Sequence, residues 1–227
     1  MPRIARAVLV ALLAVSCGGQ PATIAPSASA SAATSPSAAA SPTLAPLPAG
    51  ALSFRVADGS KAVIRVNEVV ASVQVPGEAV VTTTAMDGAF VLLADGSFAS
   101  GSKIRADLDR LKSDNDLRDE WIKINTLQTR LYRYAEFTPL RVSGVPLPVP
   151  PSGSWTAKID GTMKIKTTER PVTWEVTITR DPAKVASTGT IVFKFGDYGM
   201  DVPANRLVLS VKDEVRLQVD LVATEAR

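Results

Sequence analysis

Apolar and polar residues alternate along most of the chain after residue 50. In residues 170–179, four apolar side chains, among them Trp174 and Val176, alternate with threonine and glutamate. Residues 103–108 and 213–223 repeat this pattern. A period of two places one face of a β-strand against a core and the other face in water. Weaker runs of the same kind cover residues 52–56, 62–66, 79–84, 89–93, 154–165 and 189–195.

Turn-forming pairs separate these runs. They are Asp58-Gly59, Pro76-Gly77, Asp87-Gly88, Asp95-Gly96, Asp160-Gly161 and Asp181-Pro182. About eight strands with one apolar face each must close on themselves or pack in two layers. The longer runs favour a tall barrel over a sandwich, and an eight-stranded barrel has room for side chains or for one ligand. We therefore predict an all-β fold, an eight-stranded antiparallel barrel.

Two segments depart from the alternation. Ser113 is in a position to cap a helix, and Leu117 and Trp121 follow at helical spacing, which predicts one short α-helix over about residues 114–124. Residues 146–151 contain four prolines and predict a stiff, extended connection between two strands.

The N-terminus has the features of an export signal. Two arginines precede the apolar residues 7–15, a run too short for the roughly 20 residues that cross a bilayer. Residues 13–18 then resemble a bacterial lipoprotein lipobox, because a small residue precedes the only cysteine of the chain. That resemblance implies cleavage after Ser16 and a diacylglycerol thioether on Cys17. An ordinary secretory signal with an incidental cysteine is the alternative.

The segment that follows has little to bury. Residues 18–50 carry no charge, and 29 of these 33 residues are Ala, Ser, Pro, Thr or Gly. Such a composition is typical of a disordered tether. The predicted organisation is a lipoprotein signal peptide over 1–16, a lipidated cysteine and tether over 17–50, and a barrel domain over 51–227. We expect an exported protein, anchored to the bacterial membrane, whose domain lies in the periplasm or at the cell surface.

The composition argues against catalysis. The 227 residues include no histidine and one cysteine, which excludes a Ser-His-Asp triad, an imidazole base, an intrachain disulfide and Cys₄ metal sites. We therefore expect no enzyme, no metal and no cofactor. Without Arg3 and Arg6 the chain has 23 basic and 22 acidic residues, a balance that gives no reason to expect nucleic acid as a partner.

Two motifs mimic catalytic ones. Ser100 and Lys103 fit the S-x-x-K motif of serine β-lactamases, but there the serine opens a long helix, whereas here a predicted strand follows. Neighbouring carboxylates such as Asp119 and Glu120 are expected by chance among so many acidic residues, although a carboxylate hydrolase stays open as an alternative.

Several short motifs follow one another in a distinctive order. They are residues 88–96, 108–114, 117–119, 127–129, 135–137, 170–174, 195–200 and 208–213. Their order and spacing resemble the YceI-like, polyisoprenoid-binding, lipocalin-like family over nearly all of residues 51–227. The resemblance implies a lipocalin-like barrel that holds a long isoprenoid lipid.

The apolar strand faces are the candidate site. Periodicity alone favours a filled core, as in a structural or adhesion module, whereas the resemblance implies a lipid-lined interior. The candidate lining residues are Phe90, Ile104, Leu108, Trp121, Met163, Trp174, Val176, Phe193, Leu217 and Val219. Trp121, on the helix, would then close one end. A cavity of several hundred Å³ separates the two interpretations.

The hypothesis that Cys17 carries the lipid anchor can be tested by removing its sulfur atom. Cys17→Ser removes the sulfur that would carry the lipid, so the variant should leave the membrane fraction or remain unprocessed. Metabolic labelling with a fatty acid measures this, and equal acyl label in wild type and variant would contradict lipidation at Cys17.

Overall fold

The computed structural model describes residues 47–71, 75–204 and 208–226. The signal peptide, Cys17 and most of the predicted tether lie outside these residues. The strands are β1 (Leu52–Val56), β2 (Lys61–Val70), β3 (Pro76–Thr83), β4 (Met86–Leu92), β5 (Lys103–Asp107), β6 (Tyr134–Ser143), β7 (Gly153–Ile165), β8 (Thr168–Asp181), β9 (Lys184–Phe193) and β10 (Val208–Glu225). The helical segments are η1 (Leu108–Arg110), α1 (Asp116–Trp121), the π-helix η2 (Ile122–Leu127) and η3 (Phe195–Tyr198).

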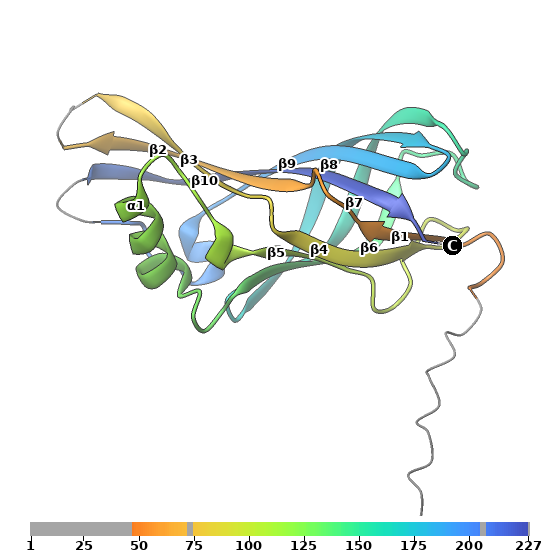
Figure 1. The fold of residues 1–227 in the computed structure, drawn as a ribbon, viewed down its shortest axis with the longest axis horizontal. Helices are drawn as coiled ribbons and strands as arrows, with labels where there is room; N and C mark the ends of the chain where they lie inside the picture. The colour runs from red at the N-terminus through yellow and green to blue at the C-terminus, as the bar shows by residue number, and fades with distance from the viewer. Residues whose placement is uncertain (1–46, 72–74, 205–207, 227) are drawn as a thin grey trace, which may run out of the picture. The chain divides into compact units, whose positions relative to one another are not determined.

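Eight strands form a closed antiparallel ring, which confirms the predicted barrel. The order β1-β4-β5-β6-β7-β8-β9-β10 closes where the end of β10 pairs with β1, with Phe54 opposite Glu225. The earlier part of β10 pairs with β2, and β3 lies outside β2. The barrel therefore continues at the α1 end into a two-strand extension, while β1 and the end of β10 lie at the opposite end (Figure 1).

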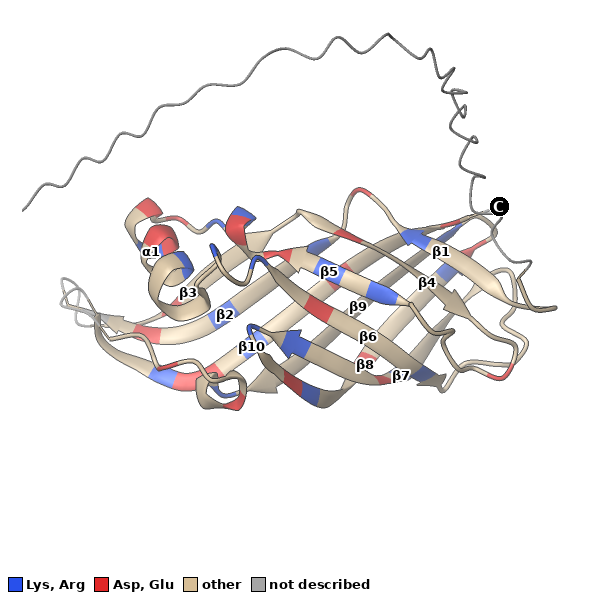
Figure 2. Ribbon diagram, turned by 90° about the horizontal axis from the view of Figure 1, so that it is seen from below, with Lys and Arg blue, Asp and Glu red and all other residues tan. Residues whose placement is uncertain are grey.

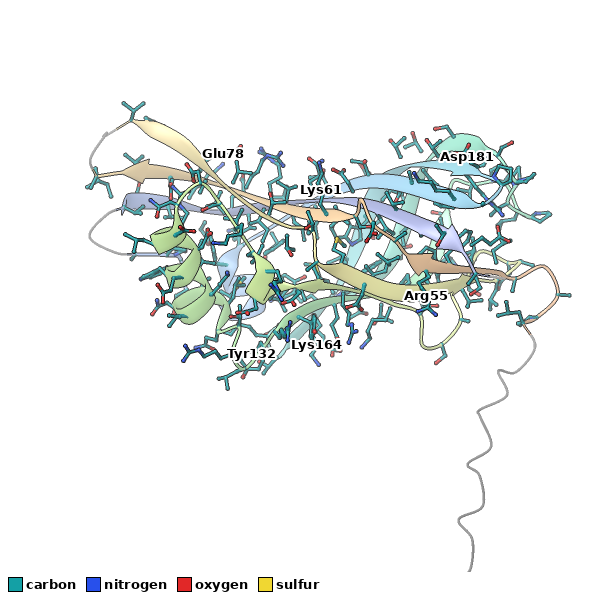
Figure 3. The ribbon with its side chains drawn as sticks, viewed as in Figure 1. Arg55, Lys61, Glu78, Tyr132, Lys164 and Asp181 are labelled. Carbon is teal, nitrogen blue, oxygen red and sulfur yellow. The ribbon has the colours of Figure 1, made fainter. Side chains whose placement is uncertain are left out.

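The alternation in the sequence appears as an inner apolar face and an outer charged face. Outer side chains pair between neighbouring strands, as Lys61 does with Asp220 at 3.4 Å and Lys164 with Glu169 at 3.2 Å (Figure 3). Basic and acidic positions are interspersed along the strands (Figure 2). Exposed pairs of this kind contribute little stability, so burial of the inner face holds the barrel together. In the described part of the chain, no helix is long and apolar enough to cross a membrane.

The helix is present, but its predicted cap was wrong. Asn115, rather than Ser113, is the N-cap, and its side chain accepts from the Arg118 N–H at 3.0 Å. Ser113 instead donates its hydroxyl to the buried carboxylate of Asp119 at 2.6 Å and its N–H to the same oxygen at 2.9 Å. Helix α1 therefore begins after Asn115, at Asp116. It ends at Trp121, where the π-helix follows.

Strand β6 was missing from the predicted strands because its alternation breaks in the middle. The register against β7 shifts between Pro139 and Arg141, which marks a β-bulge. Phe137 and Pro139 are two residues apart, as a period of two requires. The next buried residue, Val142, comes three residues after Pro139. A period of two therefore does not persist along the segment, and the proline itself argued against a strand.

The cap gives the first stability prediction. Asn115→Ala should lower the free energy of unfolding by about 1 kcal/mol, because the Arg118 N–H loses its acceptor. Asn115→Ser restores an oxygen at the cap and should recover most of that loss. Urea denaturation measures both variants, and equal losses in the two would show that the cap bond contributes nothing.

Candidate functional site

The barrel encloses a cavity of about 510 Å³. Its wall comes from the inner faces of β2 to β10, and from α1, η1, η2 and η3. Small residues on facing strands leave this space open, because no side chain on those positions reaches across the barrel. These small residues are Ala62, Ala79, Ala106 and Ala135.

The size of the cavity argues against a packing defect. Ligand pockets commonly have about 300–1,000 Å³. A packing defect is small and closed, whereas this cavity meets solvent beside the exposed Leu117. Its volume and apolar wall are within the range of pockets that admit a small molecule.

Nine of the ten predicted lining residues border this cavity. They are Ile104, Leu108, Trp121, Met163, Trp174, Val176, Phe193, Leu217 and Val219. Phe90 is the exception: it borders a second, smaller cavity of about 90 Å³, where it stacks on Phe54 with ring centroids 5.3 Å apart. The alternation gave the correct face of the strand for Phe90 but carries no information on its depth along the barrel.

Other lining residues were not among those predicted. Ile64 and Val81 lie on strands whose alternation was recognised, so their inward direction could have been read from the same period. Met200 follows η3 in an irregular segment, and Ile122 belongs to the π-helix, where no strand period applies. Sequence spacing offers no comparable signal for these two.

The α1 end of the cavity meets solvent. Leu117 borders the cavity although 69% of its surface is exposed. Beside it, Arg118 of α1 forms an ion pair with Glu68 of β2 at 2.8 Å, and both residues border the cavity. This pair fastens the helix to the strand extension. Trp121 on the same helix also borders the cavity and is half-buried.

The second cavity adjoins the first. Five residues border both: Ile104, Phe137, Ile159, Ser187 and Leu221. Phe137 packs edge-on against Trp174, with ring centroids 6.1 Å apart, and it lies over Gly161 of the neighbouring strand. These shared residues lie between a main chamber on the α1 side and a second chamber toward β1.

Two buried polar atoms on the main chamber have no partner among the described residues. They are the indole Nε1 of Trp174 and the Oγ1 of Thr126. Both atoms are covered by the surrounding protein, so they are unmet hydrogen-bonding groups inside the wall and do not face the open space of the cavity. On the far side of the wall, Tyr198 packs against Phe193 with ring centroids 5.0 Å apart, and burial raises the pKa of its phenol to about 12.

The catalytic mimics do not converge on the cavity. Ser100 is exposed in the β4–β5 connection, and Lys103 pairs with Glu136 at 2.8 Å. Among the described residues, no group of three or more Asp, Glu, Cys or His side chains could hold a metal ion.

A family model described as a YceI-like domain matches residues 55–223. The chain belongs to the YceI-like domain family. Among solved structures, a polyisoprenoid-binding domain from Saccharophagus degradans implicated in plant cell wall breakdown is similar at a TM-score of 0.59 and 10% identity, covering 77% of this chain and 99% of that one. BcnA from Burkholderia cenocepacia is similar at a TM-score of 0.50 and 16% identity, covering 73% and 96%. No curated protein sequence matches.

The close approach of Phe137 to Gly161 gives a stability prediction. A Cβ atom at Gly161 would lie 2.6 Å from the Phe137 ring and 2.5 Å from the Thr138 carbonyl oxygen, so Gly161→Ala should cost about 1–3 kcal/mol through overpacking. Gly196→Ala is the matched control, because nothing lies within 4 Å of its Cβ position. Thermal unfolding should separate the two variants, and similar melting temperatures would contradict the tight contact at Phe137.

Proposed function

We propose that this protein binds one long apolar lipid of the isoprenoid class inside its barrel. The observation that carries the proposal is the cavity of about 510 Å³ with a predominantly apolar wall, open near Leu117. Membership of the YceI-like family supports it. So does the likeness of the fold to a domain described as polyisoprenoid-binding. A structural module with a filled core does not account for the empty space.

Hydrophobic transfer supplies the driving force in this proposal. Apolar surface leaving water gains about 25 cal/mol per Å², before the cost of ordering the lipid. The aromatic and aliphatic wall can contact the lipid along its whole length. A branched, unsaturated chain has fewer free rotations than a saturated acyl chain of equal length, so ordering it costs less entropy.

Export and membrane anchoring are part of the same proposal and rest on the sequence of residues 1–50. A diacylglycerol on Cys17 with a further acyl chain would give stable attachment to a membrane. The Ala/Ser/Pro segment would then allow the barrel to reach lipid near that surface. We infer a carrier or reservoir for lipid, without catalysis.

Two matched substitutions of alanine by phenylalanine distinguish a ligand cavity from a filled core. Ala135 borders the cavity, so Ala135→Phe should fill free space, cost less than about 1 kcal/mol, and weaken binding of a fluorescent prenyl lipid about tenfold or more. Ala157 is 1% exposed and borders neither cavity, so Ala157→Phe should overpack the core at about 1–3 kcal/mol.

The two measurements are thermal unfolding and lipid titration. Strong destabilisation by Ala135→Phe, together with no prenyl-lipid binding by the wild type, would contradict the proposed function and favour the structural module.

A further inference from the structure

Exposed apolar side chains occur around the open end of the main cavity. Leu117 of α1 is 69% exposed, Ile124 of η2 is 51% exposed, and Leu209 near the start of β10 is 61% exposed. Val75, directly before β3, and Val202, between η3 and β10, are also exposed. We call these five residues the rim. Single exposed apolar residues are common, so the rim has meaning only if its members share one place on the molecule.

The rim residues come from segments that surround the opening. Leu117 borders the cavity, as do Pro203, which follows Val202, and Val208, which precedes Leu209. The start of β10 and the start of β3 both pair with the end of β2, so the residue before β3 lies at the same tip. Figure 1 and Figure 2 show α1 and these strand ends at one end of the barrel. The exposed apolar residues therefore flank the opening of an apolar cavity.

The charged groups at this end do not form a basic patch. Arg118 is paired with Glu68 at 2.8 Å and also with Asp114. Lys112 is paired with Asp116 at 2.8 Å. Helix α1 itself carries three acidic residues and one basic residue. Attraction of a polybasic segment to anionic lipid is therefore not available here, and apolar contact is what the rim offers.

We propose that the rim docks on a phospholipid bilayer with zwitterionic headgroups, so that a lipid passes between the bilayer and the cavity without crossing water. The inference rests on the proposed lipid binding and extends it to the surface that supplies the lipid. A long isoprenoid is held in a bilayer by the same hydrophobic transfer that would hold it in the barrel. The opening must then face the bilayer, and this contact buries the rim. A protein partner or a second copy on the rim would instead cover the opening.

Fluorophores at single positions test the contact. The only cysteine is Cys17, so the full-length Cys17→Ser protein has no thiol and no thioether anchor. Leu209→Cys and Ile124→Cys in that background each place an environment-sensitive fluorophore on the rim, and neither residue borders a cavity described above. Leu140→Cys is the matched control. Leu140 is 67% exposed, and its carbonyl oxygen accepts from the N–H of Phe98, which borders the second cavity away from the rim.

Phosphatidylcholine vesicles with a quencher on their acyl chains should quench the fluorophores at Leu209 and Ile124 and shift their emission to the blue. The fluorophore at Leu140 should stay in water. Addition of phosphatidylglycerol should not increase the quenching, because the rim is not basic. Equal quenching at all three positions, quenching at none, or quenching only with anionic lipid overturns the proposal. A dimer of the Cys17→Ser protein that Leu209→Asp converts to a monomer also overturns it, in favour of a second copy on the rim.

Transfer of a fluorescent prenyl lipid out of the same vesicles links the contact to the cavity. Leu209→Asp should slow this transfer about tenfold, because withdrawing one leucine from apolar contact costs at least that factor. Its Kd for prenyl lipid supplied without vesicles should equal that of wild type. Leu140→Asp should keep the wild-type rate and Kd. Equal transfer rates in the two variants overturn this inference and leave the proposed function standing, whereas quenching at the rim without prenyl-lipid binding overturns the proposed function and leaves the bilayer contact.

Discussion

The pairing of β10 with both β9 and β1 is the interaction on which the rest of the molecule depends. Strand β10 is 18 residues long, and it reaches from the α1 end, where it pairs with β2, to the opposite end, where it pairs with β1. Without that last pairing, β1 and β10 would each present unpaired N–H and C=O groups at a sheet edge. Closure satisfies these groups and turns every inner side chain toward one shared interior.

The size of the inward-facing side chains then determines whether the interior is filled or open. A ring of eight strands can be filled by large residues or left partly open. Here the alanines on β2, β3, β5 and β6 leave the main chamber open. Met163, Val176 and Val215 are buried around it and keep the wall continuous. The middle of the barrel is therefore less densely packed than a filled core, as expected of a binding protein.

Much of this arrangement could be predicted from the sequence. A period of two assigns a residue to a face, and this assignment placed eight residues on the main cavity and Phe90 on the second, while Trp121 was assigned from the helix. The period fails where the backbone departs from a regular ladder, as at the bulge after Pro139 in β6. The sequence around the helix start also does not show which polar residue is the N-cap of α1. The buried carboxylate of Asp119 accepts from Ser113, and Asn115 caps the helix.

Arg180 shows a different limit. The steps from Trp174 through Val176 and Ile178 lead to Arg180 on the same face of β8, so the period points this arginine inward. A charged residue at the end of an apolar run reads as the end of the strand, and only the Val149, Pro150 and Glu225 contacts show that the strand continues with the charge buried. Depth along the barrel and the partners of a buried charge depend on segments distant in sequence.

The central claim is that an isoprenoid lipid occupies the barrel, and the lipid that co-purifies with the protein tests it most directly. The full-length protein with Cys17→Ser, which cannot carry a thioether lipid, would be purified without detergent, extracted with organic solvent and analysed by mass spectrometry. The account predicts a non-covalent isoprenoid in a stoichiometric amount. Extracts that contain no lipid, or only phospholipid acyl chains in the proportions of the membrane, would contradict it.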